Sequence, residues 1–337
     1  MSLLTSHDVL AAADRIHHLI ARTPLLSSPA ADEVFGRQVV VKAENLQLTG
    51  SFKARGALNA VAALSPAARG KGIVGASSGN HAQALALAAR HFGAPATVVI
   101  PDDAPTTKVE GVRALGARIV TYDRASGRRD QIVHRLSREQ GLSVVPSADS
   151  HPVIAGAGTA AWEMLRERPD LVAILVPVGG GGLAAGTCLA ASHRTPAVSV
   201  IGVEPETADD TRRSLTTGRR VRIPAPVTIA DGLGHTQPGA LTFDVLHRLI
   251  SDIVTVPEEL IAGAMAFLWR HYRAAAEPSG AVAFAGLMAA ADRLPPGPVG
   301  VILSGGNVDW TRYRTLLDTA MTRKDNPAHA PAAALLH

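Results

Sequence analysis

The sequence contains a single cysteine, Cys188, among its 337 residues. One cysteine cannot form an internal disulfide, which fits a reducing compartment, and we expect a cytoplasmic protein. Aromatic residues make up only 4% of the chain, which argues against stacking platforms for nucleic-acid bases. The net charge is +4 and the isoelectric point is near 9.6, but the positive charges are scattered rather than clustered into a stripe. We therefore expect no nucleic-acid partner.

Long uninterrupted apolar runs are also missing from the N-terminus. Asp8, Asp14 and Arg15 interrupt the first 20 residues, which excludes a signal peptide or a membrane span there and predicts an amphipathic helix capped by Thr5 or Ser6. We expect no membrane partner. The chain is instead rich in apolar residues, at 47%, and has 18% charged residues. This composition allows a sizeable core, and the length suggests about two domains.

Short apolar runs alternate with alanine-rich helical stretches along the chain. This alternation predicts an α/β fold with parallel sheets that are covered on both faces. The helical stretches include His81–His91, Thr107–Leu115 and Ala157–Arg166. The predicted strands are Val39–Lys42, Ile73–Ala76, Ala96–Ile100, Arg118–Thr121, Leu171–Pro177, Val198–Val203 and Val299–Leu303.

The stretch 73–145 contains its own series of strand–helix units, which predicts a small domain inserted into a larger one. We assign residues 66–149 to the small domain, residues 1–65 and 150–325 to a discontinuous large domain, and residues 326–337 to a loosely held tail. The cleft between the two domains is then the expected ligand site.

Lys53 lies in the segment Glu44–Gly56, at the start of a predicted helix that continues into an alanine-rich run. Thr49 or Ser51 is expected to cap this helix. A lysine near a helix N-terminus opposes the helix dipole, which suits a lysine that must lose its proton to form a Schiff base. The alternative is an ordinary surface lysine, but Lys53 is flanked by Phe52 and an alanine rather than by charged residues.

Three further glycine-bearing motifs each follow a predicted strand. Ser77-Ser78-Gly79-Asn80-His81 opens a helix, where backbone N–H groups and two hydroxyls make a natural carboxylate cradle. Gly179-Gly180-Gly181-Gly182 precedes a helix that begins near Leu183, and glycines allow the backbone to wrap an anion such as a phosphate. Ser304-Gly305-Gly306-Asn307 ends a strand, where open α/β sheets bind ligands, and Ser304 can offer its hydroxyl to a ring nitrogen. Each motif alone is also compatible with an ordinary turn.

The four glycines have a competing interpretation. Gly180-x-Gly182-x-x-Ala185 fits a loose dinucleotide fingerprint, and Glu204 ends the next predicted strand about 20 residues later, where a ribose-binding acid would lie. The alternative is therefore an NAD-dependent oxidoreductase. That assignment leaves Lys53 and the other glycine loops unexplained.

Taken in this order, the four motifs resemble the serine/threonine dehydratase and serine racemase branch of the fold type II pyridoxal-phosphate (PLP) enzymes, over about residues 22–309. The resemblance implies that the large domain binds PLP in the cleft and that the small domain closes over the substrate. It implies that Lys53 holds PLP as an imine beside Phe52, and that Asn80 contacts the 3-hydroxyl oxygen of the ring. Gly179–Leu183 would hold the phosphate, and Ser304 would face the pyridine nitrogen.

The resemblance also implies a reaction. The serines of Ser77–His81 and the four glycines point to the dehydratase branch, since related sulfhydrylases and threonine synthases usually carry threonine in these loops. Such an enzyme eliminates the β-hydroxyl of L-serine, L-threonine or a related 3-hydroxy amino acid and yields a 2-oxo acid and ammonia. The loop Ser77–His81 would bind the substrate carboxylate, and the freed amine of Lys53 would remove the Cα proton.

Ser78 raises an alternative outcome. If it lies on the ring face opposite Lys53, it would return a proton there, so a serine or hydroxyaspartate racemase or a threo-3-hydroxyaspartate ammonia-lyase stays open. The sequence does not rank elimination against racemisation or choose among the hydroxy-amino-acid substrates. By the same resemblance we expect a homodimer.

Glu204 and Asp210 carry a second implication of the resemblance. In racemase-like members, an acid, a backbone carbonyl and a second acid at this spacing hold Mg²⁺ or Ca²⁺, and the ligands here would be Glu204, the Ala208 carbonyl and Asp210. All are oxygens, as a hard cation requires. The alternative is a capped helix start at Asp209-Asp210.

Two further segments have open roles. Arg129, or equally Arg128, matches an arginine near the racemase substrate site. Glu277–Gly280 is similar to a family stretch near the ring, and its own role stays open.

Overall fold

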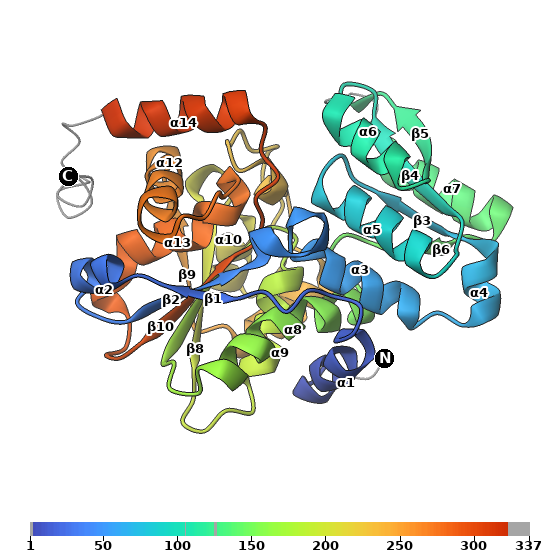
Figure 1. The fold of residues 1–337 in the computed structure, drawn as a ribbon. Helices are drawn as coiled ribbons and strands as arrows, with labels where there is room; N and C mark the ends of the chain where they lie inside the picture. The colour runs from blue at the N-terminus through green and yellow to red at the C-terminus, as the bar shows by residue number, and fades with distance from the viewer. Residues whose placement is uncertain (1–2, 105, 125–126, 323–337) are drawn as a thin grey trace.

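The computed structural model describes residues 3–104, 106–124 and 127–322 (Figure 1). The chain forms two separate sheets, one of six strands and one of four. Within this described part, none of the helices combines the length and the hydropathy that a membrane span requires. The tail predicted for residues 326–337 lies outside the described residues.

The larger sheet has the order β1-β2-β10-β7-β8-β9. All neighbouring strands in it are parallel except β1 and β2, which pair antiparallel. Its strands are β1 Leu25–Ser27, β2 Val39–Ala43, β7 Ala173–Pro177, β8 Ser199–Pro205, β9 Asp252–Val256 and β10 Val299–Leu303.

The smaller sheet has the order β5-β4-β3-β6 and is parallel throughout. All of its strands come from one stretch of the chain, within the segment predicted as the small domain, although the domain boundaries themselves stay a prediction. The strands are β3 Ile73–Ala76, β4 Ala96–Pro101, β5 Arg118–Tyr122 and β6 Ser143–Val144.

Helices cover both faces of each sheet, as the alternation of strands and helices predicts (Figure 1). The α-helices are α1 Ser6–Ile16, α2 Pro29–Phe35, α3 Lys53–Ala62, α4 Pro66–Lys71, α5 Asn80–His91, α6 Thr106–Ala114, α7 Arg129–Gln140, α8 His151–Glu167, α9 Gly182–Ala191, α10 Asp210–Thr217, α11 Ala240–Leu249, α12 Glu258–Phe267, α13 Pro278–Ala290 and α14 Trp310–Thr322. Short helical turns are η1 Glu44–Leu46, η2 Leu48–Gly50, η4 Glu206–Ala208, η5 Asp231–Leu233, η6 Leu268–Tyr272 and η7 Ala291–Arg293.

The period-two geometry of strands divides the core of the larger sheet into two layers. In β2, Val39 and Val41 face a buried cluster with α12, α13 and α14, whereas Val40 faces a second cluster with α8, α9 and α11. In the smaller sheet, Ile73 packs with α5 while Val74 packs with α7. Because the central strands β2, β7 and β10 of the larger sheet are covered on both faces, their continuous apolar runs become core.

Helix α3 lies between the two sheets. It contacts α8, which covers the larger sheet, and α5, which covers the smaller one. Since parallel strands end at the same edge of a sheet, the loops after β3, β7 and β10 open toward this junction. The fold therefore brings three separate motifs to the start of the helix that begins at Lys53.

Several local predictions were wrong in detail. The strands β1, β6 and β9 were not predicted, and Glu204 lies within β8 rather than at its end. Neither Thr49 nor Ser51 caps α3: Phe52 occupies the cap position without a side-chain cap bond. Thr49 instead adopts a left-handed turn conformation with φ 59°, in the turn that precedes α3.

Candidate active site

A pocket of about 280 Å³ opens at the junction of the two sheets. Its wall contains Phe52 and Lys53 of α3 and every residue of the predicted loops Ser77–His81 and Gly179–Leu183. The remaining lining residues are Ala76, Arg124, Arg129, Ser147, Ala148, Pro177, Asp231, Gly232, Leu233, Gly234, His235, Glu277, Ser279 and Ser304.

Lys53 is the first residue of α3 and lines the pocket. Its Nζ lies 2.7 Å from the carbonyl oxygen of Ser147, to which it donates a hydrogen bond, and 4.9 Å from the centre of the Phe52 ring. Burial lowers the pKa of Lys53 from 10.5 to about 8, although the nearby Glu277 carboxylate acts in the opposite direction. This amine therefore loses its proton far more readily than a surface lysine.

The motif Ser77–His81 follows β3 and runs into the first turn of α5, which begins at Asn80. The Ser77 amide donates to the Val99 carbonyl at 3.2 Å. The Oγ of Ser77 accepts a hydrogen bond from the Gly79 amide at 3.1 Å, which holds the loop in a tight turn. Gly79 is the cap residue of α5 and bears no side-chain cap bond, so the first amides of that helix stay available to an anion.

The side chain of His81, in the same motif, is held by a hydrogen bond to the backbone. Its ring is buried, and Nε2 lies 3.0 Å from the carbonyl oxygen of Val145 in the smaller sheet's core. Burial, together with the positive charge of Lys53, lowers the pKa of His81 to about 4. The neutral ring thus anchors the loop to the Val145 backbone, and His81 is also one of the residues that line the pocket.

The glycine loop between β7 and α9 leaves no room for side chains. A Cβ at Gly179 would lie 3.1 Å from the Leu233 backbone, and one at Gly182 would lie 3.1 Å from the backbone of Ala148. Gly181 has φ +82° and caps α9, a conformation that side-chain-bearing residues rarely adopt. The loop can therefore turn its amides toward an anion at the helix N-terminus.

Ser304 follows β10 and is buried at the base of the pocket. Its Oγ lies 3.4 Å from the carbonyl oxygen of Ser279, to which it donates a long hydrogen bond. Its own carbonyl accepts the Phe52 amide at 3.0 Å, which ties the end of β10 to the start of α3. Ser304 therefore lines the same pocket as Lys53 and the glycine loop.

A chain of hydrogen bonds crosses from one side of the pocket to the other. Asn80 donates from Nδ2 to Glu277 Oε1 at 2.6 Å, and its Oδ1 accepts from Asn307 Nδ2 at 2.8 Å. Asn307 Nδ2 also donates to the Thr49 carbonyl at 2.7 Å. Asn80 is thus held on both sides by residues from the opposite part of the fold.

Four polar or charged lining residues were not predicted from the sequence: Arg124, Ser147, Asp231 and His235. Ser147 accepts the hydrogen bond of Lys53 through its backbone carbonyl. Every residue has such a carbonyl, so no sequence pattern predicts this contact. The pKa of His235 is lowered to about 4 by burial, with additional effects of the positive charges of Lys53 and Arg129. A glycine-rich stretch, 231–235, was the available signal for this segment.

The sequence left Arg128 and Arg129 as equal candidates, and the structure separates them. Arg129 lines the pocket, whereas Arg128 is the residue before α7 and is not among the lining residues. Arg129 forms an exposed ion pair with Asp130, and Arg124 forms one with Asp103. Such exposed pairs are weak, so a ligand anion can compete for both arginines.

Glu204 and Asp210 lie together, away from the pocket lining. The carboxylate of Glu204 is fully buried and accepts the backbone amides of Thr211 at 3.1 Å and Arg212 at 2.9 Å. It is therefore not available to a ribose, which argues against the NAD alternative. Asp210 is also fully buried, and neither of its carboxylate oxygens has a hydrogen-bond partner among the described residues.

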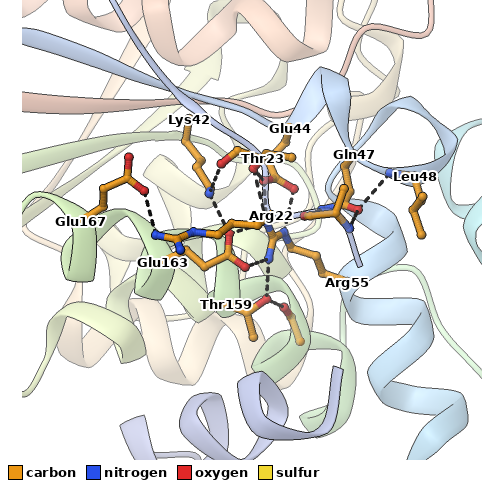
Figure 2. Close-up of polar contacts among 12 residues, drawn as sticks. Arg22, Thr23, Lys42, Glu44, Gln47, Leu48, Arg55, Thr159, Glu163 and Glu167 are labelled. Atoms are coloured by element: carbon orange, nitrogen blue, oxygen red, sulfur yellow. Dashed lines mark hydrogen bonds and ion pairs between the residues drawn. The ribbon is translucent and has the colours of Figure 1, made fainter. Parts of the chain in front are cut away.

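A buried ion network surrounds Arg55, which lies in α3 two residues after Lys53 (Figure 2). Arg55 donates to Glu44 and Glu163, and Lys42 donates to Glu163 at 2.7 Å and to the Thr23 carbonyl. Burial alone would raise the pKa of Glu163, but hydrogen bonds and charges from Arg55 and Lys42 lower it. Two cations thus balance two carboxylates where α3, β2 and α8 meet.

The fold and the pocket define an α/β protein that places the partly buried amine of Lys53 between the loop Ser77–His81 and the glycine loop Gly179–Gly182. The family model described as pyridoxal-phosphate dependent enzyme matches residues 16–305. An L-threo-3-hydroxyaspartate ammonia-lyase from Saccharomyces cerevisiae is 43% identical over 317 residues, which cover 94% of this chain and 97% of that protein. A serine racemase from Schizosaccharomyces pombe is 40% identical over 315 residues, with 94% and 98% covered.

Solved structures agree with this assignment. The serine racemase of Dictyostelium discoideum has a TM-score of 0.86 and 38% identity, over 91% of this chain and all of that chain. This chain therefore belongs to the family of pyridoxal-phosphate dependent enzymes, with the fold type II architecture that the four motifs predicted.

Proposed function

We propose that this protein is a PLP-dependent ammonia-lyase that eliminates the β-hydroxyl of a 3-hydroxy amino acid to yield a 2-oxo acid and ammonia. The observation that carries the proposal is the position of Lys53, whose amine has a lowered pKa and lies between the cradle Ser77–His81 and the loop Gly179–Gly182. Relatives that are named ammonia-lyases, and that align with at least 94% of this chain, support the proposal.

The residues of the pocket fit PLP. The glycine loop has no room for Cβ atoms and presents a helix N-terminus, which suits the cofactor phosphate. Lys53 offers a primary amine for the cofactor aldehyde, and Ser304 offers a neutral hydroxyl for the ring nitrogen. When bound, PLP supplies an electron sink for negative charge at the substrate Cα.

The chain's own groups then have distinct tasks. The amides of Ser77–His81 bind the substrate carboxylate and orient the Cα–H bond. The amine of Lys53, released when the substrate binds, takes the Cα proton, which its lowered pKa makes feasible near neutral pH. A neutral hydroxyl at Ser304, rather than a carboxylate, would not hold a proton on the pyridine nitrogen of PLP, so the cofactor would supply a weaker electron sink.

The cationic lining favours a substrate with a second carboxylate. Arg124 and Arg129 reach the pocket from the smaller sheet's side, and serine or threonine would leave both without a ligand anion. We therefore favour threo-3-hydroxyaspartate over serine and threonine. The relatives from Saccharomyces cerevisiae and Pseudomonas sp, each 43% identical and named L-threo-3-hydroxyaspartate ammonia-lyase, support this choice.

Racemisation stays a second candidate because Ser78 lines the pocket. Racemisation needs a second group that returns a proton to Cα from the side opposite Lys53. The Ser78 hydroxyl is the candidate for that donor. Relatives named serine racemase support this outcome. The predicted homodimer is retained as a proposal, which light scattering after size-exclusion chromatography measures directly.

The Mg²⁺ or Ca²⁺ site is also proposed, at Glu204, the Ala208 carbonyl and Asp210. The residues fit a hard cation: burial raises the pKa of Glu204 to about 8 and of Asp210 to about 7, and both Asp210 oxygens are buried without a hydrogen-bond partner among the described residues. A divalent cation would satisfy these oxygens. Thermal unfolding with Mg²⁺, with Ca²⁺ and with a chelator tests the site, and equal midpoints in all three would exclude it.

The function is tested on the purified protein with PLP. Borohydride reduction followed by peptide mass mapping should place a pyridoxyl group on Lys53. L-serine, L-threonine and both enantiomers of threo-3-hydroxyaspartate are then assayed for 2-oxo acid and ammonia, and for inversion by chiral chromatography. Absence of oxo acid from every substrate would refute the lyase assignment, and bound nicotinamide would favour the oxidoreductase alternative.

A further inference from the structure

Glu277 occupies a defined position at the start of α13. It is the cap residue of that helix, so the helix dipole favours a negative carboxylate there. Its backbone amide donates to the Gly305 carbonyl at 3.1 Å, and a Cβ at Gly305 would collide with Glu277 Oε1. The carboxylate is 7% exposed and is aimed past Gly305 toward Asn80.

Asn80 belongs to the other side of the pocket, at the first turn of α5. Its Nδ2 donates to Glu277 Oε1 across 197 positions of sequence, and its Oδ1 accepts from Asn307. Because a carboxylate only accepts and the Asn307 amide nitrogen only donates, the two partners determine which end of the Asn80 amide faces which way. The amide group is therefore oriented without any ligand.

The bond to Glu277 uses one of the two amide hydrogens of Asn80. The other hydrogen stays available to the pocket that Asn80 lines. A short bond to a charged acceptor also polarises the amide and strengthens the donor character of that second hydrogen. This is the donor that would be offered to the ring of PLP held at Lys53.

We propose that Glu277 is a positioning residue, which accepts one amide hydrogen of Asn80 and so presents the other to the cofactor ring. The inference rests on the proposed function only for the identity of the cofactor, not for the reaction. Asn307 acts with Glu277 from the opposite side, and Gly305 is glycine because a side chain there would push Glu277 away from Asn80. The interaction also joins the start of α5 to the start of α13, across the pocket.

The test compares E277A, E277Q and N307A in the PLP-loaded enzyme. E277A removes the acceptor, and we expect the PLP dissociation constant of the apoprotein to rise about tenfold, the loss of one charge-assisted hydrogen bond. The visible band of the bound cofactor should shift, and kcat should fall by about 10- to 100-fold with a smaller change in KM. E277Q keeps an accepting oxygen and should recover most of each loss, and N307A should shift the band in the same direction.

E258A is the matched control, because Glu258 also lies in the first turn of a helix and accepts a backbone amide, from Ile229 at 2.7 Å, but lies outside the pocket lining. It should leave the visible band and PLP affinity at wild-type values. The proposal is overturned if E277A has the wild-type band and affinity, or if E277Q is as defective as E277A. If E277A does not fold, the other two variants decide. A shifted band in N307A together with near-wild-type PLP affinity in E277Q supports the proposal, whereas a wild-type band in N307A together with a defective E277Q overturns it.

The readouts separate this inference from the lyase assignment. PLP affinity and the visible band are measured without substrate. A protein that binds PLP through Lys53 but makes no oxo acid refutes the proposed function and leaves the role of Glu277 to be decided by the variants.

Discussion

The guanidinium of Arg55 lies against the carboxylate of Glu44, with Nε 2.7 Å from Oε2 and Nη2 2.8 Å from Oε1, and both side chains are 0% exposed. Arg55 follows Lys53 by two residues in α3, and Glu44 follows β2 in η1. The pair therefore ties the helix that presents Lys53 to the larger sheet. Glu163 of α8 completes the attachment by accepting from Nη1 and Nη2, along another edge of the guanidinium (Figure 2).

Arg55→Met should destabilise the protein strongly, because it leaves the Glu44 carboxylate buried without its cation. Breaking such a pair costs about 3–5 kcal/mol. Arg22→Ala is the control: it removes the pair with Glu167, whose side chains are 74% and 41% exposed, and should cost less than about 1 kcal/mol. Urea unfolding of both variants gives the two free energies of unfolding. Similar values for the two would contradict the account of the network.

Lys53→Ala should abolish the visible band of bound PLP and lower kcat at least about 1,000-fold, because both the imine and the base are lost. Lys53→Arg should be equally inactive, since a guanidinium forms no imine. Lys71→Ala removes an exposed lysine of α4 and should retain the band and the rate. Absorption spectra and initial rates decide the matter, and normal turnover by the alanine variant would remove the basis of the assignment.

Gly181→Ala should weaken PLP binding, because this residue has φ +82° and a Cβ would lie 2.8 Å from that of Thr242. The left-handed conformation alone costs about 1–2 kcal/mol for a residue with a side chain. Gly218→Ala carries the same kind of strain, at φ +68°, with nothing within 4 Å. It should lower stability and leave the PLP dissociation constant unchanged. PLP titration of the two apoproteins separates strain from loss of the anion loop.

Acid should destabilise the folded protein through His81, whose pKa is lowered to about 4 by burial. Below about pH 6.5 the unfolded chain binds a proton at this histidine, whereas the folded chain stays unprotonated there until about pH 4. The contribution of His81 to the free energy of unfolding therefore falls as the pH falls below 6.5 and is constant above it. The loss from this group is about 2 kcal/mol at pH 5. In His81→Gln the unfolding free energy should depend less on pH between 6.5 and 5. An unchanged slope in urea titrations would show that His81 is not the group responsible.

Arg129→Met should reduce kcat/KM for L-threo-3-hydroxyaspartate by about 10- to 100-fold, the effect of losing a charged hydrogen-bond partner. L-serine has no second carboxylate, so its kcat/KM should change much less. Arg128→Met removes the neighbouring charge outside the pocket lining and serves as the control. Equal losses for both substrates in the Arg129 variant would mean that the arginine does not read the second carboxylate.

Much of the site was predictable from local patterns. The apolar runs that became β3, β7 and β10 were predicted because buried parallel strands are continuously apolar, and each is followed by the loop that lines the pocket. The strands β1 and β6 have only three and two residues, which is too short for a recognisable hydrophobic pattern. They form because each pairs with the exposed edge of a neighbouring strand, β2 and β3 respectively. The helix start at Lys53 was predicted correctly, but its caps were not, because the preceding turn takes a left-handed course.

The sequence by itself determined the α/β class, the parallel strands and the four loops of the pocket, because strand periodicity and glycine's conformational freedom are local properties. Only the tertiary structure decided which side chains meet: Glu277 with Asn80, Arg55 with Glu44 and Glu163, and Arg129 rather than Arg128 with the pocket. These contacts join positions up to 197 residues apart. Their geometry depends on how two sheets pack around α3, which no local pattern encodes.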